Sequence, residues 1–135
     1  MRLLGFRTDV MSIMNACDLF VLPCPVEGFG LVLVEAMSLG KPVIATAAGG
    51  PLEIVDDGGT GLLVPPGNST AMAGAIERLL RSPQIRGEMG MRGLEKYRAE
   101  FTVERMAQET IGVYRRVLAG PAKWSSGAVP ASASA

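Results

Sequence analysis

The chain of 135 residues contains no histidine and only two cysteines, Cys17 and Cys24. Structural zinc sites use clusters of cysteine and histidine, and small secreted domains are held by several disulfides, so the sequence speaks against both classes. A metal-binding Asp-x-Asp pair is missing as well, and we expect no metal and no cofactor. Two thiols without a disulfide framework are typical of a reducing cytoplasm.

The chain also lacks a net excess of positive or negative charge, and it has no long apolar run. Thirteen basic and thirteen acidic residues cancel, which gives no electrostatic argument for binding nucleic acid. No apolar run reaches the ~18 residues of a membrane span, and the amino terminus lacks a signal-peptide pattern. We therefore expect one small cytoplasmic domain, and leave open a peripheral attachment of the intact protein to a membrane.

What the sequence does contain is an alternation of short apolar strands and helix patterns. One strand is expected to end at residues 3–5, and three more are expected over 19–22, 42–46 and 61–64. Helices are expected over 9–16, 30–39 and 71–80, with two more starting at Ser82-Pro83 and Thr102. This order predicts an α/β fold with a parallel sheet and flanking helices. Residues 119–135 are rich in Gly, Pro, Ser and Ala and predict a disordered tail.

The most informative segment follows the apolar strand at 19–22. Glu27 and Glu35 flank a Gly-Phe-Gly turn that opens a very apolar helix. Gly28 and Gly30 allow the backbone to approach a ligand closely, and the first amides of the helix favour an anion. Neither a P-loop nor a third glycine of a dinucleotide fingerprint is present, so the turn is no nicotinamide site.

Glu35 is unusual because the helix around it has almost no polar face, which predicts that its side chain is mostly buried. A buried carboxylate needs a partner, since losing hydration is unfavourable by several kcal/mol. A backbone amide, an arginine or Ser38 could receive it. Alternatively, with Glu27 nearby, the pair could hold the hydroxyls of a sugar or ribose, because one carboxylate accepts two hydrogens.

The segments 27–37, 40–46 and 49–50 together resemble the Glu-x7-Glu signature of retaining family 4 glycosyltransferases with the GT-B fold. The segments 5–10, 16–23, 53–55 and 59–64 follow that family's usual order, so the resemblance covers roughly residues 3–118. It implies a Rossmann-like domain that binds a nucleoside diphosphate sugar and transfers the sugar with retention. Glu27 would hold the sugar and be the catalytic residue, and Glu35 would hold the ribose. The sugar and diphosphate would also contact the backbone of Gly28, Phe29, Gly30, Leu31 and Val32.

Two further sites stay open in the sequence. Arg7 could face the nucleotide or be an ordinary surface charge. Gly49-Gly50 could form a sharp turn or approach the donor sugar closely, whereas Asp56-Asp57 before Gly58-Gly59 predicts a plain turn.

The resemblance also implies what lies outside the chain. A GT-B enzyme has two Rossmann-like domains, and residues 1–118 match only the second half of the second one. We therefore expect a fragment that needs the missing acceptor domain or a partner chain, and that is inactive alone. The alternatives are a nucleotide-sugar epimerase of the same fold, which would need acid and base groups, and a non-catalytic binding fragment.

Overall fold

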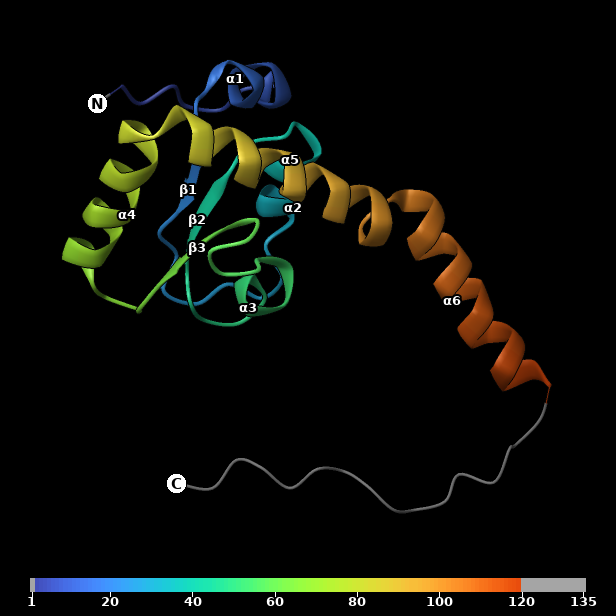
Figure 1. The fold of residues 1–135 in the computed structure, drawn as a ribbon. Coiled ribbons are helices and arrows are strands. Elements are labelled where there is room, and N and C mark those ends of the chain that lie inside the picture. The colour runs from blue at the N-terminus through green and yellow to red at the C-terminus, as the bar shows by residue number, and fades with distance from the viewer. Residues whose placement is uncertain (1, 120–135) are drawn as a thin grey trace, which may run out of the picture. The chain divides into compact units, whose positions relative to one another are not determined.

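A computed structural model describes residues 2–119, and its centre is a parallel sheet of three strands (Figure 1). The strands are β1 (Phe20–Leu22), β2 (Val43–Thr46) and β3 (Gly61–Val64), in that spatial order. Phe20 pairs with Val43, and Val43 pairs with Gly61. The expected α/β class with a Rossmann-like parallel sheet is confirmed.

Each strand is followed by a helix, as crossovers between parallel strands require. The helices are α1 (Val10–Ala16), α2 (Leu31–Ser38), α3 (Pro51–Ile54), α4 (Ser69–Arg81), α5 (Pro83–Glu100) and α6 (Val103–Leu118). The Asn68 side chain accepts a hydrogen bond from the Ala71 amide and caps α4, and Ser82 caps α5 in the same way. Helix α6 belongs to a second compact unit that starts at Val103, and by itself it is an amphipathic helix with no buried residue.

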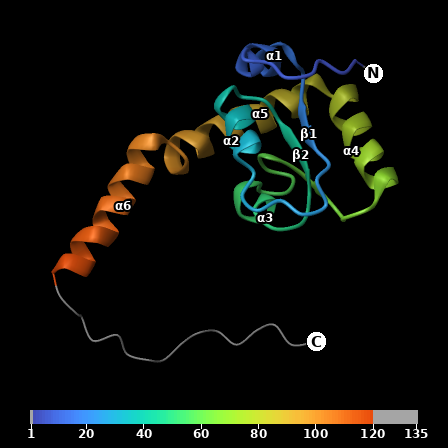
Figure 2. The ribbon, with the colours of Figure 1, turned by 180° about the vertical axis from the view of Figure 1, so that it is seen from behind.

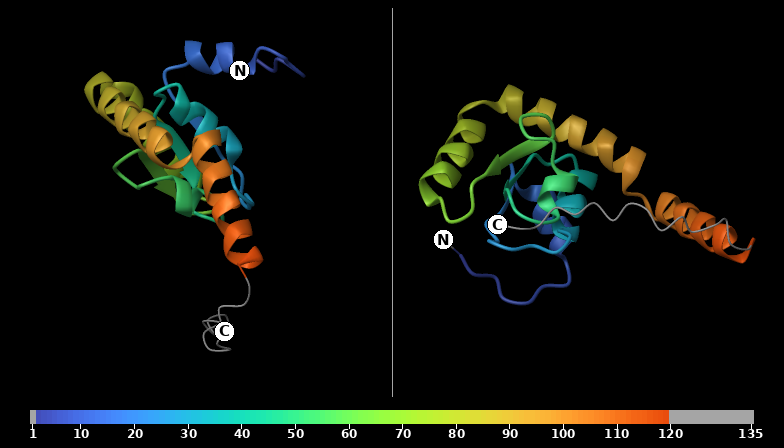
Figure 3. Two further views of the ribbon diagram at one scale, coloured as in Figure 1. Left: turned by 90° about the vertical axis from the view of Figure 1, so that its right-hand side faces the viewer. Right: turned by 90° about the horizontal axis from the view of Figure 1, so that it is seen from below.

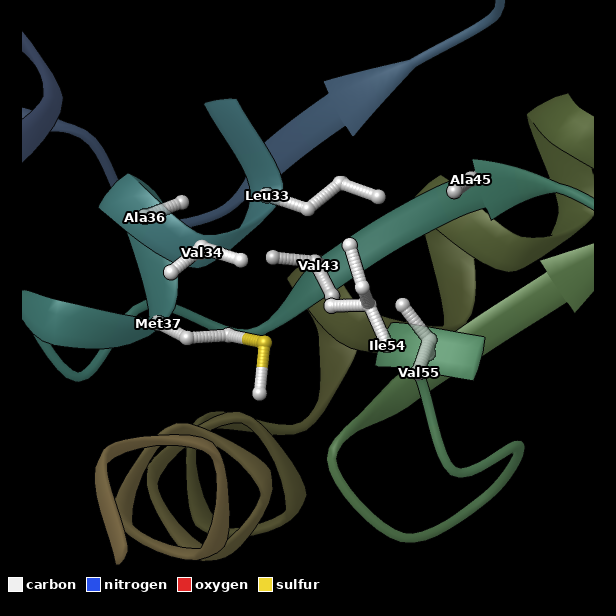
Figure 4. Packing of buried hydrophobic residues seen from close by; sticks show 8 residues of the cluster. All are labelled: Leu33, Val34, Ala36, Met37, Val43, Ala45, Ile54 and Val55. Atoms are coloured by element: carbon white, nitrogen blue, oxygen red, sulfur yellow. The ribbon is translucent and has the colours of Figure 1, made fainter. Parts of the chain in front are cut away.

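One face of the sheet packs against α2 and α3 (Figure 4). Leu33 and Met37 of α2 meet Val43 and Ala45 of β2, with Ile54 at the end of α3 closing the cluster. Strand side chains alternate between the two faces, so Val43 and Ala45 share this one.

The other face packs against α4, so the sheet lies between α2 and α4 (Figures 2 and 3). Ile44 of β2 and Leu62 of β3 contact Leu79, and the stripe with Met72 and Ile76 lies against them. The prediction that the apolar stripe of α4 packs on the sheet is confirmed.

Helix α5 lies across the amino ends of all three strands. Arg86 forms an ion pair with Asp18, which precedes β1, at 3.3 Å. A Cβ atom on Gly90 would lie 2.1 Å from the carbonyl oxygen of Gly40, which precedes β2. Farther along α5, a Cβ atom on Gly93 would lie 3.8 Å from the carbonyl oxygen of Thr60, which precedes β3. Helix α5 therefore covers the amino edge of the sheet and leaves the carboxyl edge free for ligands.

One expectation about the chain's elements is wrong, and one short helix was missed. Residues 3–5 form no strand, and Leu3 is 87% exposed. A strand needs a neighbour for its backbone groups, and the three-stranded sheet of the described chain does not include this segment. The short helix α3 was not predicted, although Pro51 at its first position is a known start signal.

The remaining predictions about chain organisation are tested only in part. The predicted tail lies outside the described residues, apart from Ala119. None of the described helices combines the length and the apolar character that crossing a bilayer requires. The turn predicted at Asp56-Asp57 is confirmed, with the Gly59 amide donating to the Asp56 carbonyl.

Candidate functional site at the carboxyl edge of the sheet

The loop between β1 and α2 carries most of the predicted site residues. Gly30 adopts φ 101°, a left-handed conformation that glycine takes readily, and its carbonyl accepts the Leu33 amide at 2.9 Å. This sharp change of direction sends the chain from the end of β1 into α2. Gly28 has a different role, because a Cβ atom there would meet no other atom within 4 Å.

The Gly49-Gly50 turn holds this loop in place. The Gly50 amide donates to the Glu27 carbonyl at 3.0 Å. A Cβ atom on Gly49 would lie 2.1 Å from the Glu27 carbonyl oxygen, and one on Gly50 would lie 2.0 Å from the Phe29 carbonyl oxygen. Gly49 and Gly50 therefore do approach a neighbour closely. Within the described chain, that neighbour is the backbone of the Glu27 loop.

Sequence reasoning missed this contact between loops. It also missed Ile54, a fully buried residue of α3 that lies beneath Gly30. The available signal was the Gly-Gly-Pro run, which predicts a tight turn before a helix start but does not say which segment packs on it.

The N-terminus of α2 provides free donors beside the loop. The amides of Leu31 and Val32 lie in the first turn of α2, so no carbonyl of the helix is placed to accept a hydrogen bond from them. No other described residue accepts from them either. Leu31 is 66% exposed and Phe29 is 46% exposed, so this helix end is open to solvent. Its partial positive charge favours an anion.

Glu35 lies one helical turn after Leu31, and the two share one side of α2. The expectation that Glu35 is mostly buried is confirmed, although the residue is not fully enclosed. Leu31 and Val32 lie with Glu35 outside the buried stripe of α2, even though both are apolar. Exposure on this side keeps the carboxylate within reach of a ligand.

Neither carboxylate has a partner among the described residues. Ser38 donates to the backbone carbonyl of Glu35 at 2.6 Å, not to its side chain. No hydrogen bond or ion pair engages the side chains of Glu27 and Glu35 within residues 2–119. Of the partners considered from the sequence, none is found in this part of the chain.

The Arg7 side chain forms an ion pair with a residue close to it in the sequence. Its Nε donates to Asp9 Oδ1 at 2.7 Å, and both side chains are about half exposed. The hydrogen bond with Arg7 holds the pKa of Asp9 below its usual range, and the same contact raises the pKa of Arg7. Whether Arg7 contacts a nucleotide stays a prediction.

The chemistry of the remaining groups is limited. Within the described residues, no cluster of three or more His, Cys, Asp or Glu side chains could hold a metal ion. The expectation of no metal and no cofactor stays a prediction.

Comparison with known proteins identifies the family. The profile of the family "Glycosyl transferases group 1" matches residues 1–96. The chain is 32% identical over 115 residues to an alpha-D-kanosaminyltransferase of Streptomyces kanamyceticus, covering 84% of this chain and 30% of the relative. It is 35% identical over 115 residues to the N-acetyl-alpha-D-glucosaminyl L-malate synthase of Bacillus anthracis, covering 85% and 30%. This chain belongs to the glycosyl transferases group 1 family.

A solved structure agrees with the fold. Anabaena HepE, determined in complex with UDP and glucose, superimposes with a TM-score of 0.82 at 34% identity. The superposition covers 85% of this chain and 32% of HepE. The fold described above is thus that of a Rossmann-like domain of GT-B glycosyltransferases, and the chain spans about a third of its relatives' length.

Proposed function

We propose that this chain is the donor-binding part of a family 4 glycosyltransferase, which transfers a sugar from a nucleoside diphosphate sugar to an acceptor with retention. One observation carries the proposal. Two carboxylates without partners in the described chain, Glu27 and Glu35, flank the free amides at the start of α2. Such a set matches a ligand that has hydroxyls at two places and an anion between them.

The proposed roles follow from the order of these groups along the site. The diphosphate lies at the amides of Leu31 and Val32, where the helix dipole favours negative charge. Glu35, one turn farther along α2, accepts the ribose hydroxyls. Glu27, in the preceding loop, accepts hydroxyls of the transferred sugar and is the proposed catalytic residue because it touches that sugar.

The helix N-terminus has a further role in transfer. Negative charge grows on the diphosphate as its bond to the sugar breaks, and donors fixed in advance stabilise this charge without reorganising. In other enzymes, one such donor lowers the barrier by roughly 3 to 4 kcal/mol. The Gly49-Gly50 turn supports this arrangement, since it holds the Glu27 backbone in place.

The relatives support a nucleotide sugar as substrate. HepE was crystallised with UDP and glucose, and another HepE structure holds UDP-glucose. One relative is named as a kanosaminyltransferase and the other as the synthase of a glucosaminyl malate. Because the chain spans 30% of either protein, the acceptor and the complete reaction belong to a longer assembly in this proposal.

Amide chemical shifts of the 135-residue chain test the donor site. We expect UDP to shift the amide signals of Leu31, Val32 and Glu35 saturably, and UDP-glucose to shift those of Glu27 and Gly28 as well. Uridine, which lacks the diphosphate, should leave Leu31 and Val32 almost unmoved. The proposal is wrong if UDP and three other nucleoside diphosphates all fail to shift the signals of 27–35.

A further inference from the structure

A cavity of about 380 Å³ lies at the carboxyl edge of the sheet, on the face that α4 covers. Its walls come from the segment after β1, from the last residues of β2 and β3, and from the first turns of α4. They include Pro23, Thr46, Val64, Ser69, Met72 and Ile76. Neither Glu27 nor Glu35 lines it, so this space is distinct from the donor site proposed above. Volumes of 300 to 1,000 Å³ are usual for small-molecule sites.

Thr46, the last residue of β2, is directed into this cavity. Ile44, two residues earlier, packs in the cluster with Leu79 of α4. Because side chains two apart on a strand share a face, the Thr46 side chain points to the α4 side as well. Thr46 is one of the residues that line the cavity.

The Thr46 hydroxyl has no partner although the residue is only 4% exposed. No hydrogen bond to this hydroxyl is found among the described residues. A hydroxyl in so sheltered a position normally hydrogen-bonds to the protein, to water or to a ligand. No fully enclosed polar side-chain atom of the described chain lacks a partner, which means that this hydroxyl keeps contact with the cavity.

The other walls define what can enter. Met72, Ile76, Val64 and two prolines make the lining mainly apolar, and no charged residue contributes to it. A diphosphate or another strongly charged group would lose its hydration here without a counter-charge. The cavity therefore favours an uncharged molecule with an apolar body.

We propose that this cavity is a second ligand site, which binds an uncharged, mainly apolar molecule through one oxygen that hydrogen-bonds with Thr46. An aromatic or branched aliphatic alcohol has this chemistry. The apolar body lies against Met72 and Ile76, and its hydroxyl takes the place of the missing partner of Thr46. The site requires neither nucleotide nor sugar, so it stands or falls independently of the donor proposal.

Two probes of similar shape test the site in the 135-residue chain. Benzyl alcohol has the aromatic body and a hydroxyl, whereas toluene has the body alone. Methyl and amide chemical shifts of Thr46, Met72 and Ile76 are followed during titration with each probe. We expect saturable shifts for both, with tighter binding of benzyl alcohol.

Two substitutions separate the hydroxyl from the space. Thr46→Val keeps the shape and should weaken benzyl alcohol roughly threefold to tenfold while toluene binds at least as well as before. Ala73→Phe enlarges a side chain that lines the cavity and should remove binding of both probes, whereas Ala99→Phe, at another exposed helix position on α5, should change neither.

Three results would overturn the proposal. The first is the lack of saturable shifts at Thr46, Met72 and Ile76 with both probes. The second is equal binding of benzyl alcohol by the native chain and by Thr46→Val. The third is unchanged binding in Ala73→Phe. If Ala73→Phe fails to fold, as its amide spectrum would show, the Thr46→Val comparison decides alone, because removing an unpaired buried hydroxyl does not threaten the fold.

Discussion

At the scale of single residues, the carboxylates of Glu27 and Glu35 are the proposed ligand-binding groups. Ion pairs elsewhere show that the chain readily provides partners for its acids. Lys96 lies 2.7 Å from Asp56, and Arg7 is paired with Asp9. The two glutamates of the site have no such partner within the described residues. Exposed acids such as Glu53 and Glu95 also lack a partner there, so a functional role for Glu27 and Glu35 is supported by their place on either side of the free amides of α2.

The Arg7–Asp9 pair gives a prediction about pH. Its hydrogen bond lowers the pKa of Asp9, so this carboxyl should titrate below the ordinary value of about 3.9. Because the pKa is lowered, the pair stabilises the folded chain at pH values above the ordinary pKa of an aspartate. This stabilisation is lost as the pH falls through the titration of Asp9. Carboxyl carbon shifts of Asp9 measured against pH give the midpoint.

Arg7→Gln should return the Asp9 midpoint to the ordinary range, and Arg2→Gln serves as a control at an exposed position near the amino terminus. An unchanged midpoint in Arg7→Gln would show that the pair does not form in solution.

The sequence contained enough to select the candidate site residues but not their surroundings. Glu27, the Gly-Phe-Gly turn and Glu35 follow from the apolar strand and the helix start around them. The burial of Glu35 followed from the apolar helix around it. Which of the neighbouring apolar residues are exposed did not follow, because an apolar helix surface does not reveal which side the rest of the chain covers. Leu31 shows the difficulty, since it is apolar and yet 66% exposed.

At the scale of elements, the two loops at the carboxyl edge act as one unit. Gly50→Ala should displace the Glu27 loop, because the added Cβ atom would lie 2.0 Å from the Phe29 carbonyl oxygen. Overpacking of this kind destabilises by roughly 1 to 3 kcal/mol. Gly28→Ala is the matched control, since its Cβ atom meets nothing within 4 Å. Urea unfolding measures both, and equal midpoints for the two variants would contradict the loop contact.

Helix α5 offers a second pair of glycines. Gly87→Ala should stabilise the chain by up to about 1 kcal/mol, because alanine favours a helix and a Cβ atom there meets no neighbour within 4 Å. Gly90→Ala should lower stability instead by roughly 1 to 3 kcal/mol, since its Cβ atom would lie 2.1 Å from the Gly40 carbonyl oxygen. The opposite signs are the signature of α5 packing against the amino edge of the sheet. Thermal unfolding of the two variants measures them, and stabilisation by both would contradict this packing.

The elements themselves were largely predictable. β1, β2, β3 and the helices α1, α2, α4, α5 and α6 lie where apolar runs, helix patterns, caps and prolines place them. The four residues of α3 are too few to show a period, so only packing reveals them. Residues 3–5 have the apolar pattern of a strand, but pairing with a neighbour decides whether a strand forms.

At the scale of the whole molecule, the chain is a compact unit up to Thr102 followed by a second unit that contains α6. Transfer needs a positioned acceptor as well as a donor, and no acceptor site has been assigned in the described residues. We therefore predict that the purified 135-residue chain transfers no sugar from UDP-glucose or other nucleotide sugars to water or to added alcohols. A radiolabelled donor provides the assay, and steady multiple turnover would contradict the proposed division between donor and acceptor parts.

The most direct test of the account is a calorimetric titration of UDP and UDP-glucose into the native chain, Glu35→Gln and Glu27→Gln. Replacing Glu35 removes a charge-assisted contact worth roughly 1.5 to 3 kcal/mol, so affinity for both ligands should fall about tenfold to a hundredfold. Glu27→Gln should weaken UDP-glucose and leave UDP nearly unchanged. Equal losses of both ligands in Glu27→Gln, or unchanged UDP affinity in Glu35→Gln, would contradict the assignment of one carboxylate to the sugar and the other to the ribose.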